Sequence, residues 1–181
     1  NNELSKMKMV INKTLSILMI GLVPAIILLI FYAKTVILIV AGNDYIQGVV
    51  ALQFLSIALL FAVISSLLTT NIMIPNRLEN RITIIVTISA LSNIILNLFL
   101  IPLFGSAAAA LTTVIAELIV FIGASICSKE YIDYTSVFNS GLRICLASIV
   151  MIIFLNIVSY LKMNLFIEIF LGAVLSCAGY G

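Results

Sequence analysis

The fold class of this chain is decided by residues 82–127, which read ITIIVTISALSNIILNLFLIPLFGSAAAALTTVIAELIVFIGASIC. Glu117 is the one charged residue in this stretch, and its apolar residues do not alternate with polar ones as in a barrel strand. A helix needs about 20 apolar residues to cross a bilayer core about 30 Å thick. Backbone groups left unpaired in lipid cost several kcal/mol each, so a segment that is not a barrel strand must cross the membrane as a helix. Because Pro102 and Gly105 interrupt the stretch, it predicts two membrane-spanning helices, 82–101 and 107–127, joined by a tight turn.

The composition of the whole chain also indicates a membrane location. Of 181 residues, 64% are hydrophobic and 9% are charged, with 9 Lys and Arg against 7 Asp and Glu. An average soluble domain is about 25% charged, so this chain has too few charges to cover a soluble surface. The composition excludes soluble enzymes, nucleic-acid binders and disordered segments, and it predicts an all-α, polytopic transmembrane helix bundle.

Further apolar stretches bring the expected number of transmembrane helices to six. Turn-forming or polar segments separate them, for example at 42–45 and 75–81. The expected spans are 14–33, 46–74, 82–101, 107–127, 144–161 and 163–180. Residues 128–143 form the longest expected loop, and 144–181 form a terminal hairpin. Because the chain starts Asn-Asn-Glu and stops inside an apolar run, we expect it to be the C-terminal part of a longer protein.

The Lys and Arg residues predict the orientation of these spans. If the six spans alternate in direction, seven basic residues fall on one side of the membrane and two on the other. The larger group is Lys6, Lys8, Lys13, Arg77, Arg81, Lys129 and Arg143, and the smaller is Lys34 and Lys162. Cytoplasmic loops are enriched in Lys and Arg, so we expect residue 1 to lie in the cytoplasm.

The sequence offers no set of residues suited to a metal, a cofactor or covalent catalysis. It has no His, and Cys127, Cys145 and Cys177 lie far apart without a CxxC spacing. No nucleophile–base pair and no phosphate-binding loop is visible. We therefore expect a protein that is not an enzyme and that carries no cofactor.

Short motifs between residues 32 and 124 carry a resemblance to a known family. They are Gly42-Asn43-Asp44-Tyr45, Ile74-Pro75-Asn76-Arg77, and Asn93-x-x-x-Asn97-x-x-x-Ile101-Pro102-x-x-Gly105 followed by Ala109-Ala110 and Glu117. In order and spacing they resemble the C-terminal part of polysaccharide-biosynthesis flippases, which belong to the multidrug/oligosaccharidyl-lipid/polysaccharide exporter superfamily. Ala108 departs from the pattern, since the family usually has Gly there.

The resemblance implies a two-lobe flippase of twelve to fourteen spans, in which residues 1–127 would form helices of the second lobe. Such a protein moves undecaprenyl-linked oligosaccharides, such as O-antigen or capsule repeat units, across the bacterial cytoplasmic (inner) membrane by alternating access. Its partners would be this polyprenyl pyrophosphate sugar and membrane lipids, together with a polysaccharide polymerase and glycosyltransferases. Two alternatives stay open: a cation-coupled multidrug antiporter of the same superfamily, and a non-transporting membrane structural or assembly protein.

Glu117 is the strongest candidate for a transport or coupling residue. It lies about 15 Å into the helix 107–127 at 1.5 Å per residue, which is half of the bilayer core. A carboxylate at this depth costs roughly 2.5–3.5 kcal/mol by insertion scales, so it normally faces a bundle interior or a wet cavity. The competing interpretation is a buried Glu that only locks two helices together.

Other polar residues of the spans are secondary candidates. Asn93 and Asn97 share a helix face that Ser89 continues, and they are candidates for transport or for helix packing. Because Asn93 and Glu117 lie at similar depth on either side of the turn, we expect a hydrogen bond between them. Gln53 and Asn71, in the span 46–74, are candidates to line a cavity and touch a sugar or headgroup, although packing explains them as well.

Overall fold

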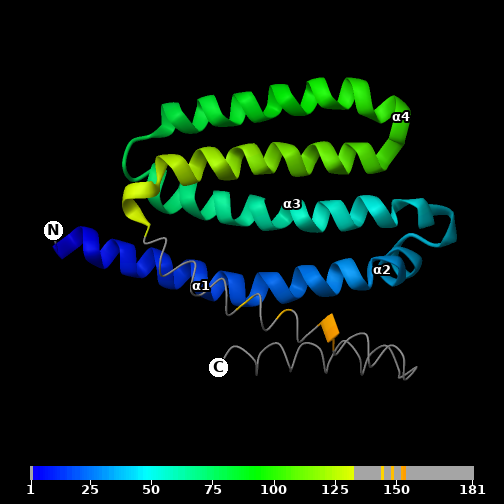
Figure 1. The fold of residues 1–181 in the computed structure, drawn as a ribbon, viewed down its shortest axis with the longest axis horizontal. Helices are drawn as coiled ribbons and strands as arrows, with labels where there is room; N and C mark the ends of the chain where they lie inside the picture. Colours follow the sequence, from blue (N-terminus) through cyan, green and yellow to red (C-terminus); the bar gives the residue numbers. More distant parts are fainter. Residues whose placement is uncertain (1, 133–143, 145–147, 149–151, 154–181) are drawn as a thin grey trace. The chain divides into compact units, whose positions relative to one another are not determined.

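The part of the chain that the structure describes is almost entirely helical (Figure 1). The structure is a computed structural model, and it describes residues 2–132, 144, 148 and 152–153. Its elements are α1 (Asn2–Phe31), α2 (Ala33–Val40), the 3₁₀-helix η1 (Asn43–Gly48), α3 (Val49–Leu68), the π-helix η2 (Thr69–Met73), α4 (Glu79–Cys127) and the 3₁₀-helix η3 (Lys129–Tyr131). The chain divides into two compact units, of which Leu29–Ile132 contains all the elements from α2 to η3.

Three helical stretches in the described residues are long and apolar enough to cross a membrane. They are Ser5–Phe31, Asn43–Met73 and Glu79–Cys127. The prediction of a helical chain with helices of membrane-spanning length is therefore confirmed, which is consistent with a membrane protein. The expected spans 144–161 and 163–180 lie outside the described residues, except for Ile144, Ser148, Ile152 and Ile153.

α4 contains a reversal of direction at Gly105, so it consists of two antiparallel legs, residues 79–104 and 106–127 (Figure 1). Gly105 has φ 60° and ψ −136°, a conformation that side-chain-bearing residues rarely adopt. Pro102 lacks a backbone N–H and so weakens the helix just before the reversal. The turn predicted at 102–105 is confirmed, and it brings Ser89 and Ala116 together across the two legs.

The start of the chain is more helical than expected. The first span was predicted from residue 14, but α1 begins at Asn2 and includes Lys6, Lys8 and Lys13. Lys has a high helix propensity, and residues 2–13 contain neither Gly nor Pro to stop the helix. The eight-residue helix α2 was not predicted at all, because it is too short to register as a span.

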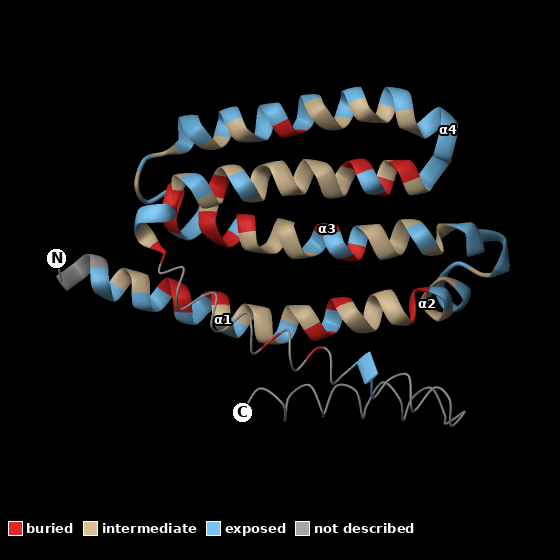
Figure 2. Cartoon of the chain, in the orientation of Figure 1, coloured by how far each residue is buried: buried red, intermediate tan, exposed pale blue. Residues whose placement is uncertain are grey.

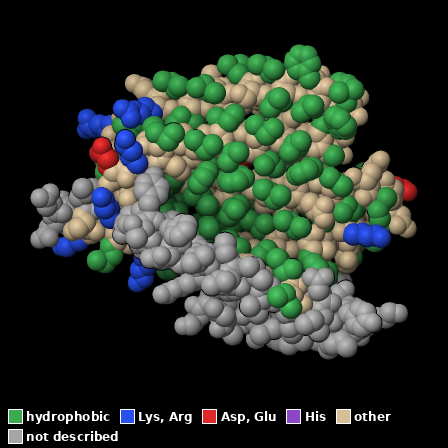
Figure 3. Space-filling view, in the orientation of Figure 1, with side chains coloured by type: hydrophobic (Ala, Val, Ile, Leu, Met, Phe, Trp, Pro, Cys, Tyr) green, Lys and Arg blue, Asp and Glu red, His purple; other side chains and the backbone are tan. Residues whose placement is uncertain are grey.

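The packed interior of the unit Leu29–Ile132 lies where α3 and η2 meet α4. Leu68, Ile72 and Met73 are almost completely buried there, as are Ala108 and Ala110 near the start of the second leg (Figure 2). Large apolar side chains cover the outer surface instead, for example Leu98 and Phe99 of the first leg (Figure 3). A surface of this kind suits lipid rather than water, because a soluble protein rarely shows a contiguous apolar patch this large.

The connection from η2 to α4 is a closed helix end. The N–H of Leu78 donates to the carbonyl of Met73 and the N–H of Arg77 to that of Ile74, the bond pair of a Schellman motif, with Arg77 at φ 55°. The Asn76 amide donates to the carbonyl of Ile72 (2.7 Å) and accepts from the Tyr131 hydroxyl (2.9 Å). This Asn thus ties the connection to η3, which gives the Ile-Pro-Asn-Arg motif a structural role.

Charged side chains mark the two ends of this unit. Arg77 and Arg81 flank the start of the first leg of α4 and Lys129 follows the second leg, so the antiparallel legs place all three at one end. Lys34 and Asp44 belong to the opposite end, before α3 begins (Figure 3). The apolar helices between these ends carry few charges, as a bilayer requires.

Candidate functional site

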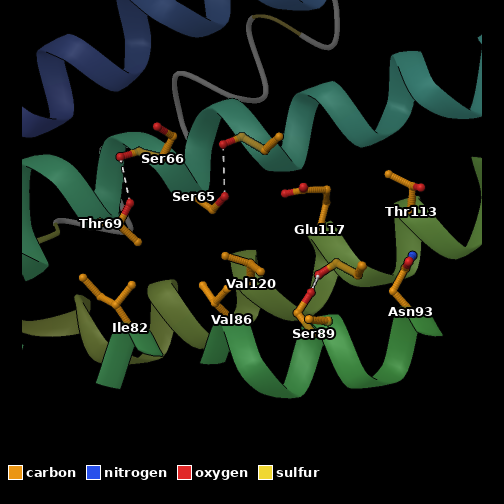
Figure 4. A pocket seen from close by; sticks show the side chains of 13 residues that line it. Ser65, Ser66, Thr69, Ile82, Val86, Ser89, Asn93, Thr113, Glu117 and Val120 are labelled. Atoms are coloured by element: carbon orange, nitrogen blue, oxygen red, sulfur yellow. Dashed lines mark hydrogen bonds between the residues drawn. The ribbon is translucent and has the colours of Figure 1, made fainter. Parts of the chain in front are cut away.

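A polar groove runs between α3 and the two legs of α4 (Figure 4). Its volume is about 540 Å³, within the roughly 300–1,000 Å³ that small-molecule sites occupy. The lining residues are Ala62, Ser65, Ser66 and Thr69 from α3 and η2; Ile82, Val86, Ser89, Ala90 and Asn93 from the first leg; and Thr113, Ala116, Glu117 and Val120 from the second leg. Three neighbouring helical segments thus turn hydroxyls, an amide and a carboxylate toward one space.

Glu117 is the one charged residue in the lining of this groove. It is half-buried and lies near the middle of the second leg, so its carboxylate sits close to the centre of the apolar part of the bundle. In Figure 4 the side chain points toward α3, on the side where Ser65 lies. The groove therefore gives this acid, in the middle of an apolar helical leg, a polar space to face. A charge buried in lipid would need such a space.

The expected hydrogen bond between Asn93 and Glu117 is absent from the described residues. Both residues line the groove, but the Asn93 Oδ1 accepts from the Asn97 Nδ2 at 2.9 Å. The bond that joins the two legs runs from the Thr112 Oγ1 to the Asn97 Oδ1, at 2.5 Å. Thr112 is completely buried, and a buried hydroxyl needs an acceptor. The prediction was wrong about the partner, because it considered depth and not the direction in which each side chain points.

A second link between the legs lies directly beside Glu117. The Ser89 Oγ donates to the backbone carbonyl of Ala116 at 2.7 Å (Figure 4). The legs also approach closely at Gly123, where an added Cβ would lie 2.8 Å from Ile85 Cγ1 and Cγ2. These contacts fix the second leg against the first and so hold Glu117 at a defined place in the groove.

The hydroxyls on the α3 side bond to their own helix. The Ser65 Oγ donates to the carbonyl of Ala62, and the Thr69 Oγ1 donates to that of Ser66, each at 3.0 Å (Figure 4). A hydroxyl that donates in this way keeps two lone pairs, so both oxygens can accept hydrogen bonds from a molecule in the groove. Thr69 also opens the π-helix η2, and π-turns inside helices occur frequently at functional sites.

Two predicted cavity residues lie outside this groove. The Gln53 Nε2 donates to the carbonyl of Ile30 at 3.2 Å, near the end of α1 where backbone carbonyls lack helical partners. The Asn71 Nδ2 donates to the carbonyl of Leu67 at 3.0 Å, within its own helical segment. In this structure both amides have backbone partners and neither lines the groove.

Three groove residues escaped the sequence interpretation: Ser65, Ser66 and Thr113. A signal was present, because Thr113 stands one helical turn before Glu117 and therefore shares its face. For α3 the sequence gives no comparable signal, since polar residues are scattered around a helix that is apolar on all sides. In residues 2–132, no three His, Cys, Asp or Glu side chains cluster as a metal site would require.

Comparison with family models, with curated proteins and with solved structures finds no match for this chain. A groove that binds through hydroxyls, one amide and one acid suits a polar, hydrogen-bonding molecule or a cation.

Proposed function

We propose that this chain is part of a transporter that flips undecaprenyl-linked oligosaccharide repeat units across the bacterial cytoplasmic membrane by alternating access. The observation that carries the proposal is the polar groove at the middle of an otherwise apolar helical bundle. In this proposal the chain contributes six spans to the second lobe of a two-lobe flippase, and the fifth and sixth spans are residues 144–161 and 163–180. The surface polysaccharide would be an O-antigen or a capsule.

The chemistry of the groove supports a sugar as cargo. A sugar loses hydrogen bonds to water when it enters a membrane, and each unpaired polar group there costs several kcal/mol. The Ser65 and Thr69 oxygens can replace part of that hydration, since each donates to its own helix and keeps lone pairs that accept hydrogen bonds from sugar hydroxyls. The apolar outer surface of α4 leaves the polyprenyl tail free to stay in lipid during the crossing.

Asn93 and Glu117 have complementary parts in this proposal. The Asn93 Oδ1 is occupied by Asn97, which leaves the Asn93 amide N–H groups to donate into the groove. A Glu117 carboxylate accepts hydrogen bonds from sugar hydroxyls, and bonds to a charged acceptor contribute about 1.5–3 kcal/mol each. Asn97 holds Asn93 in place from one turn away and so acts as a positioning residue.

A cation-coupled antiporter of the same superfamily is the second candidate. The observation that favours it is the charge of the groove, whose lining includes one acid and neither Lys nor Arg. A lipid pyrophosphate needs basic partners, which in the first proposal would come from the other lobe. A cationic drug or a coupling cation needs only Glu117 and the surrounding oxygens.

The decisive experiment is complementation of a bacterium that lacks its oligosaccharide flippase. Surface polysaccharide and inner-leaflet lipid-linked repeat units are measured together for the wild type, Glu117→Gln and Glu79→Gln. Glu79 is exposed at the start of α4 and does not line the groove, so it is the matched control. We expect Glu117→Gln to lower the flipping rate about tenfold or more, since a lost charged hydrogen bond of 1.5–3 kcal/mol corresponds to that factor.

Each outcome separates the candidates. Restored surface sugar with cleared precursor, lost only in Glu117→Gln, supports flipping through the groove. Drug resistance without any polysaccharide, again lost in Glu117→Gln, supports the antiporter. A wild type that changes neither surface polysaccharide, precursor nor drug resistance would support a structural or assembly protein and would contradict both transport proposals. A wild type that is active in either assay, with an equally active Glu117→Gln, would contradict the role of Glu117.

A further inference from the structure

The short helix α2 has an apolar surface that no described part of the chain covers. Ile39 is 73% exposed and Val40 is 80% exposed, although both have side chains that water solvates poorly. Ile37 of the same helix packs inward, since its Cδ1 lies 3.8 Å from the position that a Cβ on Gly48 would take. α2 is therefore held to η1 on one side and free on the other.

The position of α2 along the bundle defines its surroundings. The first leg of α4 is about 38 Å long at 1.5 Å per residue, so it crosses the whole apolar core. Its turn at Gly105 and the start of α3 at Val49 share the end opposite Arg77 and Arg81. α2 and η1 lead directly into α3, which places them at the level where the membrane ends.

The residues around the apolar face have the pattern of a membrane interface. α1 ends at Phe31, and Tyr32 takes a non-helical conformation (φ −95°, ψ 14°), so α2 is a separate helix and not a continuation of the span. Lys34 at its start can extend its ammonium group toward headgroups while its stem stays in apolar surroundings. Tyr45 in η1, 63% exposed, is of the residue type that collects at headgroup level.

We propose that α2 binds the lipid surface of the leaflet opposite Arg77 and Arg81, with Ile39 and Val40 inserted at the boundary between headgroups and acyl chains. α2 carries Lys34 in its first turn and exposed apolar side chains at its end, an arrangement that suits a short helix at this boundary. Membrane lipid is the occupant because other large apolar side chains are also exposed at the same end of the bundle, among them Leu103 and Phe104 of the α4 turn. This anchoring of α2 to the membrane does not depend on the function of the groove.

Tryptophan fluorescence tests the position of α2 directly. The chain contains no Trp, so a single introduced Trp reports without background. Ile39→Trp is compared in proteoliposomes with Leu91→Trp, 54% exposed near the middle of the first leg, and with Lys129→Trp at the exposed start of η3. The quenchers are aqueous acrylamide and phospholipids that carry a nitroxide either at the headgroup or deep in the acyl chain.

We expect headgroup nitroxide to quench Ile39→Trp most, with acrylamide quenching at least threefold weaker than for Lys129→Trp. Leu91→Trp should respond most to the deep nitroxide. Strong acrylamide quenching of Ile39→Trp would place α2 in water, deep quenching like that of Leu91→Trp would place it inside the span, and protection from every quencher would mean a protein cover. Each of these three results would overturn the proposal. Val40→Trp provides an independent second reporter if Ile39→Trp does not fold.

Discussion

At the scale of single residues, Thr112 decides how the two legs of α4 meet. Its hydroxyl is fully buried, and its one hydrogen is shared between two acceptors, the Asn97 Oδ1 across the turn (2.5 Å) and the carbonyl of Ala109 in its own helix (2.9 Å). The interhelical bond orients Asn97, and through it Asn93, whose amide reaches the groove. A residue without direct contact to the groove can thus control the donor that the groove presents.

We therefore predict that Thr112→Val destabilises the protein by about 0.6–2 kcal/mol, the range seen for interhelical hydrogen bonds in membranes. The substitution keeps the volume but leaves the Asn97 carbonyl without its donor. Thr113→Val is the matched control, because the Thr113 hydroxyl bonds only the carbonyl of Ala109 in its own helix. Unfolding in detergent micelles measures both variants, and equal effects would contradict a role for the Asn97–Thr112 bond.

At the scale of elements, the legs of α4 depend on small residues at their contact. Gly123 faces Ile85 so closely that a methyl group would collide with both Cγ atoms at 2.8 Å. Only a rotation about χ1 would move these atoms, and a β-branched residue in a helix strongly prefers one χ1 rotamer. Small residues allow backbones to approach in just this way in membrane helices, where packing takes the place of the hydrophobic effect.

We predict that Gly123→Ala destabilises the protein by about 1–3 kcal/mol, as overpacking does in tight cores. Ile85→Ala in the same chain should recover most of this loss, because it removes the colliding atoms. Gly21→Ala serves as the control, since nothing lies within 4 Å of the added Cβ and Ala favours the helix. Thermal unfolding of the single and double variants gives the coupling energy between the two positions. A coupling energy near zero would contradict a steric contact between Gly123→Ala and Ile85.

At the scale of the whole molecule, the basic residues predict which end of the bundle faces the cytoplasm. In the unit Leu29–Ile132, Arg77, Arg81 and Lys129 gather at one end, while Lys34 belongs to the other. Loops rich in Lys and Arg stay on the cytoplasmic side during insertion. The basic residues that the sequence assigns to the cytoplasmic side therefore lie together at one end of this folded unit.

The orientation can be measured with one matched pair of substitutions. Asn80→Cys lies beside Arg81, and Asn43→Cys lies at the opposite end; both positions are exposed and neither substitution changes the charge. In a background with the three native Cys replaced by Ala, a membrane-impermeant maleimide added to intact cells should label only Asn43→Cys. Asn80→Cys should react after the cells are permeabilised, and the reverse pattern would refute the predicted topology.

The sequence predicted those parts of the fold that depend on local composition. The turn at Gly105 was predictable because Pro102 and Gly105 each impose a backbone constraint of their own. Glu117 stood out as a candidate for the same kind of reason, since a charge deep in an apolar helix is costly wherever it lies. Its place in the lining of the groove is consistent with that expectation.

The sequence pattern predicted neither the early start of α1 nor the helix α2, because both fall outside an apolar stretch of membrane length. For the candidates Gln53 and Asn71, the sequence likewise did not predict what the side chains contact. Their polarity was visible in the sequence, but their backbone partners were not. A polar residue in a helix that is apolar on all sides gives no indication of the direction in which it points.

The sequence by itself determined the helical membrane character, the turn between the legs of α4 and the unusual acid at mid-depth, because each follows from the cost of placing a given group in lipid. Only the tertiary structure decided that the pair Asn93 and Asn97 is joined to the second leg by Thr112 and not by Glu117. It also decided that Ser65 and Thr69 face the groove. The physical reason is rotation about the helix axis. Lipid and protein interior are both apolar, so hydropathy leaves this rotation open, and the packing of side chains and their hydrogen bonds fixes it.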